Sequence, residues 1–201
     1  SEMCIRDSNI TLNTSFKSIS NCTFNGNNHT IANYTLSNKQ YAGLLPNAIR
    51  VTVKNLTLKN ANITAVNDGS NNAYAGGFIG RAYGTNVVEN CTLENSIVQG
   101  INKVGGIAGF QAENGISIRK CTVKGSTIKV DTENQEYGQC GGILGYIGSV
   151  AAANEVSGNF IINTKVEAPA NTNIGEEHRK SSICVGTLQG CLLYTSDAAD
   201  D

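Results

Sequence analysis

Apolar and polar residues alternate along most of this chain, in short runs separated by Asn and Gly. Between Val88 and Leu93 the apolar side chains, with Cys91 among them, have the polar neighbours Glu89 and Thr92. Alternation with a period of two turns one side of a strand toward a core and the other toward water. We therefore expect short β-strands with one buried face. Tandem helical repeats are excluded, because their apolar period would be about 3.6 residues.

The stretch from Val88 to Gly109 recurs along the chain. Similar copies begin at Val53 and Ile118, and each is followed by a Gly-Gly-apolar-apolar-Gly element. Successive elements are 34, 29, 36 and 44 residues apart, counted at Gly43, Gly77, Gly106, Gly142 and Gly186. Fixed columns with a variable period near about 30 residues are typical of a solenoid.

Aligning the copies predicts columns of equivalent residues in successive coils. One buried column is expected to hold Tyr34, Leu56, Cys91 and Cys121, and the next Leu58, Leu93 and Val123. Two turn columns of Asn are expected, the first Asn33, Asn55 and Asn90, the second Asn38, Asn60, Asn95 and Asn163. Asn tolerates left-handed backbone, so stacked Asn side chains would turn each coil at the same place.

These columns predict an all-β fold, a right-handed parallel β-helix with about three short strands per coil of roughly 30 residues. The third strand is placed at the glycine element. Gly77, Gly106 and Gly142 should lie on one edge of successive coils, needed there for positive φ or for close approach of two coils. The side chains of Ile79, Ala108 and Leu144 should then point to the same side of the sheet. A β-propeller is less favoured, since it needs about four strands per repeat.

Composition changes this picture little. The chain has 201 residues, 26 Asn, only 2 Pro and no Trp, and its net charge is −1. A nearly neutral chain gives no electrostatic reason to bind nucleic acid or an anionic membrane. No apolar run approaches the roughly 18 residues of a membrane span.

Both ends lack the repeat pattern. Residues 1–8 and 191–201 resemble peptides translated from sequencing-adapter DNA, so we expect them to be artefacts of a metagenomic fragment. The β-helix domain is assigned to residues 9–190, as part of a longer array, and neither end should pack into the solenoid.

The chain has seven Cys, of which Cys4 and Cys191 fall in these ends. The other five, Cys22, Cys91, Cys121, Cys140 and Cys184, form no Cys-x-x-Cys pair, which weakens zinc and thioredoxin-like hypotheses. Two of them share a column with a Leu, so a small core hydrophobe is favoured over a disulfide or a metal ligand. The redox state of the cysteines stays open.

No catalytic, cofactor-binding or metal-ligating residue is assigned. The two His, His29 and His178, lack the spacing of a zinc protease, and His29 suits a turn. Glu89 aligns with Lys54 and Arg119, and Glu94 with Lys59 and Lys124, so these outward charges of mixed sign indicate a solvated face. The loop with Asp131, Glu133 and Glu136 lacks the Asp/Gly density of a calcium site and is also expected to be solvated.

The glycine elements Gly76-Gly-Phe-Ile-Gly80, Gly105-Gly-Ile-Ala-Gly109 and Gly141-Gly-Ile-Leu-Gly145 resemble the GLUG motif of bacterial surface proteins. Phe24-Asn-Gly-Asn-Asn-His-Thr-Ile31 is similar to the Phe-Asp-Gly-Asn-Gly-His-Thr-Ile segment that often opens such arrays, with Asn25 and Asn28 as departures. The resemblance covers about residues 16–168. It implies a right-handed β-helix in a secreted or cell-surface protein, and it transfers no catalytic residue.

Two functional hypotheses follow. The favoured one is a structural or adhesive section of a secreted or cell-surface bacterial protein, not itself an enzyme and without cofactors. Its expected partner is a host glycan or a cell-surface protein, with no nucleic acid and no membrane insertion. The alternative is a carbohydrate-active β-helix resembling a polysaccharide lyase or glycoside hydrolase, or a GLUG array accompanying an IgA-cleaving metallopeptidase domain. Carboxylates gathered on one face would favour a carbohydrate-active β-helix.

Overall fold

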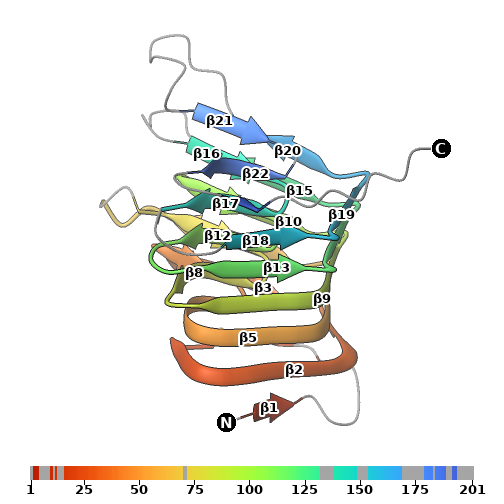
Figure 1. Cartoon of the computed structure of the whole chain (residues 1–201). Coiled ribbons are helices and arrows are strands. Elements are labelled where there is room, and N and C mark those ends of the chain that lie inside the picture. Colours follow the sequence, from red (N-terminus) through yellow and green to blue (C-terminus); the bar gives the residue numbers. More distant parts are fainter. Residues whose placement is uncertain are drawn as a thin grey trace, which may run out of the picture.

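The computed structural model describes residues 2–4, 10, 12, 16–69, 72–131, 138–148, 154–168, 179–182, 184–188 and 192–193. Within these residues the regular elements are strands that pair only in parallel, and they stack into the solenoid of Figure 1. No helix that could span a bilayer is found among them. The predicted all-β class and parallel stacking are confirmed.

The strands fall into successive coils. The first two coils hold β2 (Ile19–Ala32), β3 (Thr35–Lys39), β4 (Tyr41–Ala42), β5 (Leu45–Lys59), β6 (Asn62–Val66) and β7 (Tyr74–Gly76). The next holds β8 (Ile79–Tyr83), β9 (Asn86–Glu94), β10 (Ile97–Gly100) and β11 (Lys103–Gly105). Then follow β12 (Ala108–Gln111), β13 (Ile116–Arg119), β14 (Thr122–Lys124), β15 (Thr127–Val130) and β16 (Gly138–Gly141). After them come β17 (Leu144–Ile147), β18 (Asn154–Ser157), β19 (Phe160–Ile162), β20 (Lys165–Glu167), β21 (Arg179–Ser182) and β22 (Val185–Leu188).

These strands form three sheets along the solenoid. Sheet A, of 13 strands, contains β2, β5 and their counterparts in later coils. Sheet B has the order β20-β15-β10-β6-β3, and sheet C the order β21-β16-β11-β7-β4. Because β5 runs unbroken where later coils have two or three strands, the number of strands per coil varies while the path of the chain stays the same.

The predicted core columns are confirmed from Leu56 and Leu58 onward. Leu56 pairs in register with Cys91, and Leu58 pairs with Leu93, which in turn pairs with Val123. All these side chains, and Cys121, are buried in one continuous core. A shift of one residue in any coil would have turned its apolar set outward, so their burial fixes the register.

Residues with positive φ turn the chain at fixed places in sheet A. One column holds Asn55 (φ 55°), Asn90 (φ 51°) and Lys120 (φ 54°), and the Nδ2 of Asn90 donates to Oδ1 of Asn55 at 2.8 Å. A second holds Asn33, Asn60, Asn95, Gly125 and Asn163, with φ between 47° and 59°. The Asn columns therefore do supply left-handed backbone, and their amides bond from coil to coil.

Three predicted positions in the first coil are wrong. His29, and not Tyr34, lies opposite Leu56, and Asn33 stacks on Asn60 instead of Asn55. The register shifts between Asn25 and His29, where three residues face one in β5. The likeness of Asn33-Tyr-Thr-Leu36 to Asn55-Leu-Thr-Leu58 suggested an offset of 22 residues between the copies. The register after the bulge has an offset of 27 residues, so alignment by similarity assigned Tyr34 and Asn33 to the wrong columns. Asn38 also lies outside the left-handed column.

The glycine element is a corner between two strands and not a third strand. Gly76 ends β7 in sheet C, and Ile79 begins β8 in sheet A. Ile79, Ala108 and Leu144 stack in register as predicted. Gly77 and Gly106 do not have positive φ.

Close approach of neighbouring coils explains these glycines. A Cβ on Gly77 would collide with the carbonyl oxygen of Gly106, and one on Gly106 with that of Gly142. Backbone atoms cannot move aside without displacing the coil. Of the two reasons predicted for these glycines, positive φ or close approach of two coils, the second is therefore confirmed. The register also makes Gly43 the counterpart of Gly76 and not of Gly77.

Short strands occur at both ends. β1 (Glu2–Cys4) pairs with β2, and β23 (Leu192–Leu193) pairs with β18. These five residues therefore pair with the end coils, which the sequence did not lead us to expect. Their side chains lie outside the described residues, and the assignment of both ends as translated adapter stays a prediction.

Candidate functional surface

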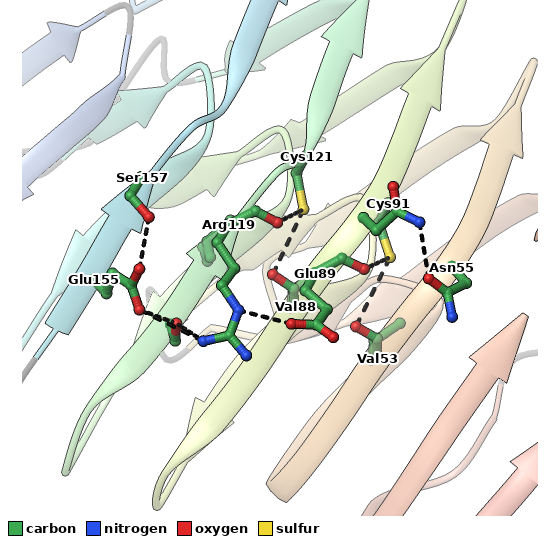
Figure 2. Close-up of polar contacts among 12 residues, drawn as sticks. Val53, Asn55, Val88, Glu89, Cys91, Arg119, Cys121, Glu155 and Ser157 are labelled. Carbon is green, nitrogen blue, oxygen red and sulfur yellow. Dashed lines mark hydrogen bonds and ion pairs between the residues drawn. The ribbon is translucent and has the colours of Figure 1, made fainter. Parts of the chain in front are cut away.

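The outward side of sheet A carries charged side chains in columns. Lys54 pairs in register with Glu89, and Glu89 with Arg119, as the sequence predicted. The Nε of Arg119 lies 2.7 Å from Glu89 Oε2, and its Nη1 lies 3.7 Å from Glu155 Oε2 (Figure 2). The hydrogen bond from Ser157 is the main reason that the pKa of Glu155 is below its usual value.

A second column repeats this arrangement. Glu94 lies between Lys59 and Lys124, whose amines are 3.2 and 3.3 Å from its two carboxylate oxygens. The hydrogen bond from Lys59 is the largest contribution to a lowered pKa of Glu94. We call these two columns the ion-pair ladders of sheet A. They match the predicted solvated face of mixed sign.

The ladders do not resemble a hydrolytic centre. An acid–base pair needs one carboxyl group whose pKa is raised, whereas Glu94 and Glu155 have lowered values. Asp131 is exposed, and its carboxylate accepts a hydrogen bond from Gln99 at 2.7 Å. The remainder of that loop, with Glu133 and Glu136, lies outside the described residues, as does His178.

His29 follows directly after the bulge in β2, beside Asn27 and Asn28 at positive φ. Its turn role stays a prediction. Among the residues that the structure places, no group of three or more His, Cys, Asp or Glu could hold a metal ion.

The cysteines behave as core residues. Cys91, Cys121 and Cys140 are buried and unbridged, and Cys22 and Cys184 are half-buried and unbridged. The thiol of Cys91 donates to the carbonyl oxygen of Val53, and that of Cys121 to Val88 (Figure 2). Burial raises the pKa of the Cys140 thiol to about 12. A thiol that stays protonated is a poor nucleophile, which agrees with a packing role for Cys140.

A different surface lies where sheet C turns into sheet A. Register places Tyr41, Tyr74, Lys103 and Gln139 in one column of sheet C. Register also places Asn47, Arg81, Phe110 and Tyr146 in one column of sheet A. We call these two columns together the aromatic–cation strip.

The two columns interlock across the glycine corner. The rings of Tyr41 and Tyr74 stack with their centroids 5.4 Å apart, and Tyr74 meets Phe110 edge-on at 4.9 Å. Phe110 continues to Tyr146 at 5.6 Å. The rings thus form an unbroken row across the coils, at spacings close to the separation of neighbouring strands.

The two cations of the strip lie over these rings. The Nζ of Lys103 is 4.8 Å from the centroid of Tyr74, 5.1 Å from Phe110 and 4.9 Å from Tyr146. The guanidinium of Arg81 lies 5.3 Å from the Tyr41 ring. Burial lowers the pKa of Lys103 to about 8 and raises that of Tyr74 to about 12. The ammonium is therefore held by ring faces in a partly dry environment.

Sequence reasoning missed this strip, although the glycine elements carry its signal. Tyr74 and Lys103 each stand two residues before the first Gly of an element, and Arg81 and Phe110 each stand directly after its last Gly. Glycine lets sheets C and A approach at the corner, since a Cβ on Gly145 would lie 2.7 Å from the amide nitrogen of Val104. Side chains flanking the glycines on both sides consequently meet.

The family model described as "The GLUG motif" matches residues 71–98. The chain carries the GLUG motif. The matched segment runs through β7, the Gly76–Gly80 corner, β8, β9 and the start of β10, so it contains Tyr74 and Arg81 of the strip and Glu89 and Glu94 of the ladders.

Among curated proteins, halomucin from Haloquadratum walsbyi is 35% identical over 97 residues, which is 47% of this chain. The chain spans about 1% of the length of halomucin. This relative is archaeal, so the match does not support the predicted bacterial source.

Among solved structures, a protein from Bacteroides ovatus proposed to be an immunoglobulin A1 protease is 17% identical, with a TM-score of 0.46. The alignment covers 82% of this chain and 68% of that one. Similarity at this level supports no inference about activity.

Proposed function

We propose that this chain is a structural section of an extracellular surface protein, with no catalytic site of its own. The observation that carries the proposal is the pairing of the outward charges. Glu94 is held between two lysines, and Arg119 between two glutamates, so these groups neutralise one another from coil to coil. Such a face keeps a long solenoid soluble without offering a reactive group.

The comparisons support a surface role. The GLUG motif occupies a coil of the solenoid, and the similar segment of halomucin belongs to a protein whose name places it among mucins. Because this chain corresponds to so small a part of halomucin, the proposal concerns these residues and not the activity or binding of the whole of that relative. A bacterial source and secretion remain part of the proposal.

We further propose that the solenoid is right-handed, with three strands as its basic coil. Parallel strands joined by a crossover within one sheet adopt the right-handed connection in about 98% of cases. The coil β5–β6–β7 has three strands, and the additional strands of later coils divide the span that β5 covers.

Two measurements test the functional proposal. Antibodies against the purified chain should label intact cells of the organism that encodes it, and brief treatment of the cells with protease should remove the label. Incubation of the purified chain with polygalacturonate or chondroitin sulfate should release neither reducing ends nor unsaturated uronides. Label confined to lysed cells would refute the extracellular placement, whereas product release would establish the lyase or hydrolase alternative.

A further inference from the structure

The cations of the aromatic–cation strip differ from those of the ladders. Lys59, Lys124 and Arg119 each meet a carboxylate within 4 Å. Over the described part of the chain, neither Lys103 nor Arg81 has an ion-pair partner. Among the described residues, the hydrogen bond that Lys103 Nζ donates goes to the neutral amide of Asn102, at 3.3 Å. A charge held among rings without a counter-ion is complementary to an anionic ligand.

Unsatisfied polar atoms gather in the same place. Of four buried side-chain atoms without a hydrogen-bond partner among the residues placed, three belong to the strip, namely Asn47 Oδ1, Arg81 Nε and Gln139 Oε1. Such atoms are rare in folded proteins because each costs free energy, and each needs an explanation. These atoms lie beneath the surface of the strip, so they make it polar under its rings without themselves being open to a ligand.

The aromatic row adds a third requirement. Tyr41, Phe110 and Tyr146 are only partly buried, so part of each ring faces solvent. The centroids of neighbouring rings in the row are 4.9–5.6 Å apart. A sugar ring has an apolar C–H face that can lie against an aromatic ring and a rim of hydroxyl groups. A polymer of such rings would meet equivalent side chains in successive coils.

We propose that the aromatic–cation strip binds an acidic polysaccharide, with carboxylate or sulfate groups at Lys103 and Arg81 and sugar rings on Tyr41, Phe110 and Tyr146. This site goes beyond the structural role proposed above and does not depend on it. An acidic peptide such as polyglutamate would satisfy the cations but has no sugar ring to lie against the aromatic rings.

The experiment is titration of the full chain with fluorescently labelled polymers at low ionic strength. Polygalacturonate carries carboxylates and chondroitin sulfate also carries sulfates, so the pair distinguishes the two anionic groups. Dextran tests neutral sugar, and polyglutamate tests charge without sugar. We expect binding to at least one acidic polysaccharide and at least about tenfold weaker binding to dextran and polyglutamate. Binding to neither acidic polysaccharide, or equal binding to polyglutamate, would overturn the proposal.

Matched variants locate the site. Lys103→Gln should weaken binding by about tenfold or more, since it removes a charge-assisted contact. Lys124→Gln changes the net charge equally but lies on a ladder, and should leave affinity within about twofold. Phe110→Leu should weaken binding, whereas Phe160→Leu, at an exposed ring of β19, should not. Thermal unfolding of each variant separates lost binding from lost folding. If both lysine variants weaken binding equally, attraction is spread over the surface and the assigned site is wrong.

The pH dependence gives an independent check. Lys103 has a pKa of about 8 in the free protein, and a bound anion raises the pKa of a nearby ammonium. Its contribution to affinity should therefore be fully present below pH 8 and should fall as pH rises through the pKa of the complex. The difference in affinity between the wild type and Lys103→Gln should shrink over this range. A difference that stays constant to well above that range would contradict a direct contact with Lys103.

Discussion

The ion-pair ladders and the aromatic–cation strip are built by the same rule, yet they present opposite chemistry. In both, parallel register places equivalent outward side chains one above another in each coil. On sheet A the sign alternates, as in Lys59, Glu94 and Lys124, and each charge finds its partner within the solenoid. At the corner the neighbours of Lys103 are rings, and its charge stays without a carboxylate among the described residues. The charges in a stacked column can therefore be paired within the solenoid or remain available to a ligand, depending on the side chains in neighbouring coils.

The glycine corner that creates the strip should be the most sensitive point. A Cβ at Gly106 would meet the carbonyl group of Gly142, so Gly106→Val should lower the free energy of unfolding by about 3 kcal/mol, the upper end of the usual cost of overpacking. Chemical denaturation measures the loss. Hydrogen exchange should show it mainly in the coils on either side, because solenoid coils couple chiefly to their neighbours.

The matched control for that variant is Gly125→Asn. Gly125 has φ of 59° and stands in a column otherwise filled by Asn, so Asn suits its backbone. The atom that an added Cβ would meet is Oδ1 of Asn95, at the end of a movable side chain, so stability should change by only a few tenths of a kcal/mol. Equal loss in both variants would show that a side chain added anywhere in a coil, and not the close approach of two backbones at the corner, explains the loss. Uniform loss of protection along the chain would indicate one cooperative unit.

Next in size is the packing of the strip itself. Tyr74 is 6% exposed and touches rings on both sides, so Tyr74→Ala should cost about 2 kcal/mol. Removal of a ladder residue should cost far less. Thermal unfolding of Tyr74→Ala and of Glu89→Ala compares the contributions of the two surfaces to stability. Similar losses in both variants would show that the strip and the ladders stabilise the fold equally.

The pH dependence of stability should show a smaller effect that distinguishes Lys103 in the strip from Lys124 in the ladder. The folded state lowers the pKa of Lys103 from 10.5 to about 8, so it binds fewer protons than the unfolded chain between these values. Stability should therefore rise with pH across that window, on the order of 1 kcal/mol from this group. Lys103→Met should abolish the rise, and Lys124→Met should preserve it. Denaturant unfolding at several pH values between 7 and 9.5 measures both slopes, and a rise that persists in Lys103→Met would belong to another group.

The ladders should give the smallest effect. Glu94→Gln should cost less than about 1 kcal/mol, because surface ion pairs in water contribute little. The pKa of Glu94 is lowered by folding, so its contribution is present at neutral pH and is lost as pH falls through the folded value. A double-mutant cycle with Lys59→Met measures the coupling, which added salt should reduce. A coupling energy that salt leaves unchanged would show that the ladder is better shielded from solvent than its exposure indicates.

The sequence by itself determined the strands, their facing and most of the stacking. Alternation with a period of two showed that Leu58, Leu93 and Val123 would be buried and that Glu94 would face water between two lysines. These inferences hold because strand facing depends only on nearest neighbours along the chain. The same local logic identified Asn as the residue of the corners, since its backbone preference belongs to the residue itself.

Tertiary structure decided which residues meet when the chain turns. Similarity between copies placed Asn33 opposite Asn55, whereas the register of β2 on β5 places it opposite Asn60. Local likeness between two segments does not reveal which register their strands adopt. Tyr74 and Phe110 are far apart in sequence and belong to different sheets, so no periodicity joins them. They meet because glycine lets two backbones approach at the corner. Contact across a corner depends on the path of the whole coil, which local alternation cannot encode.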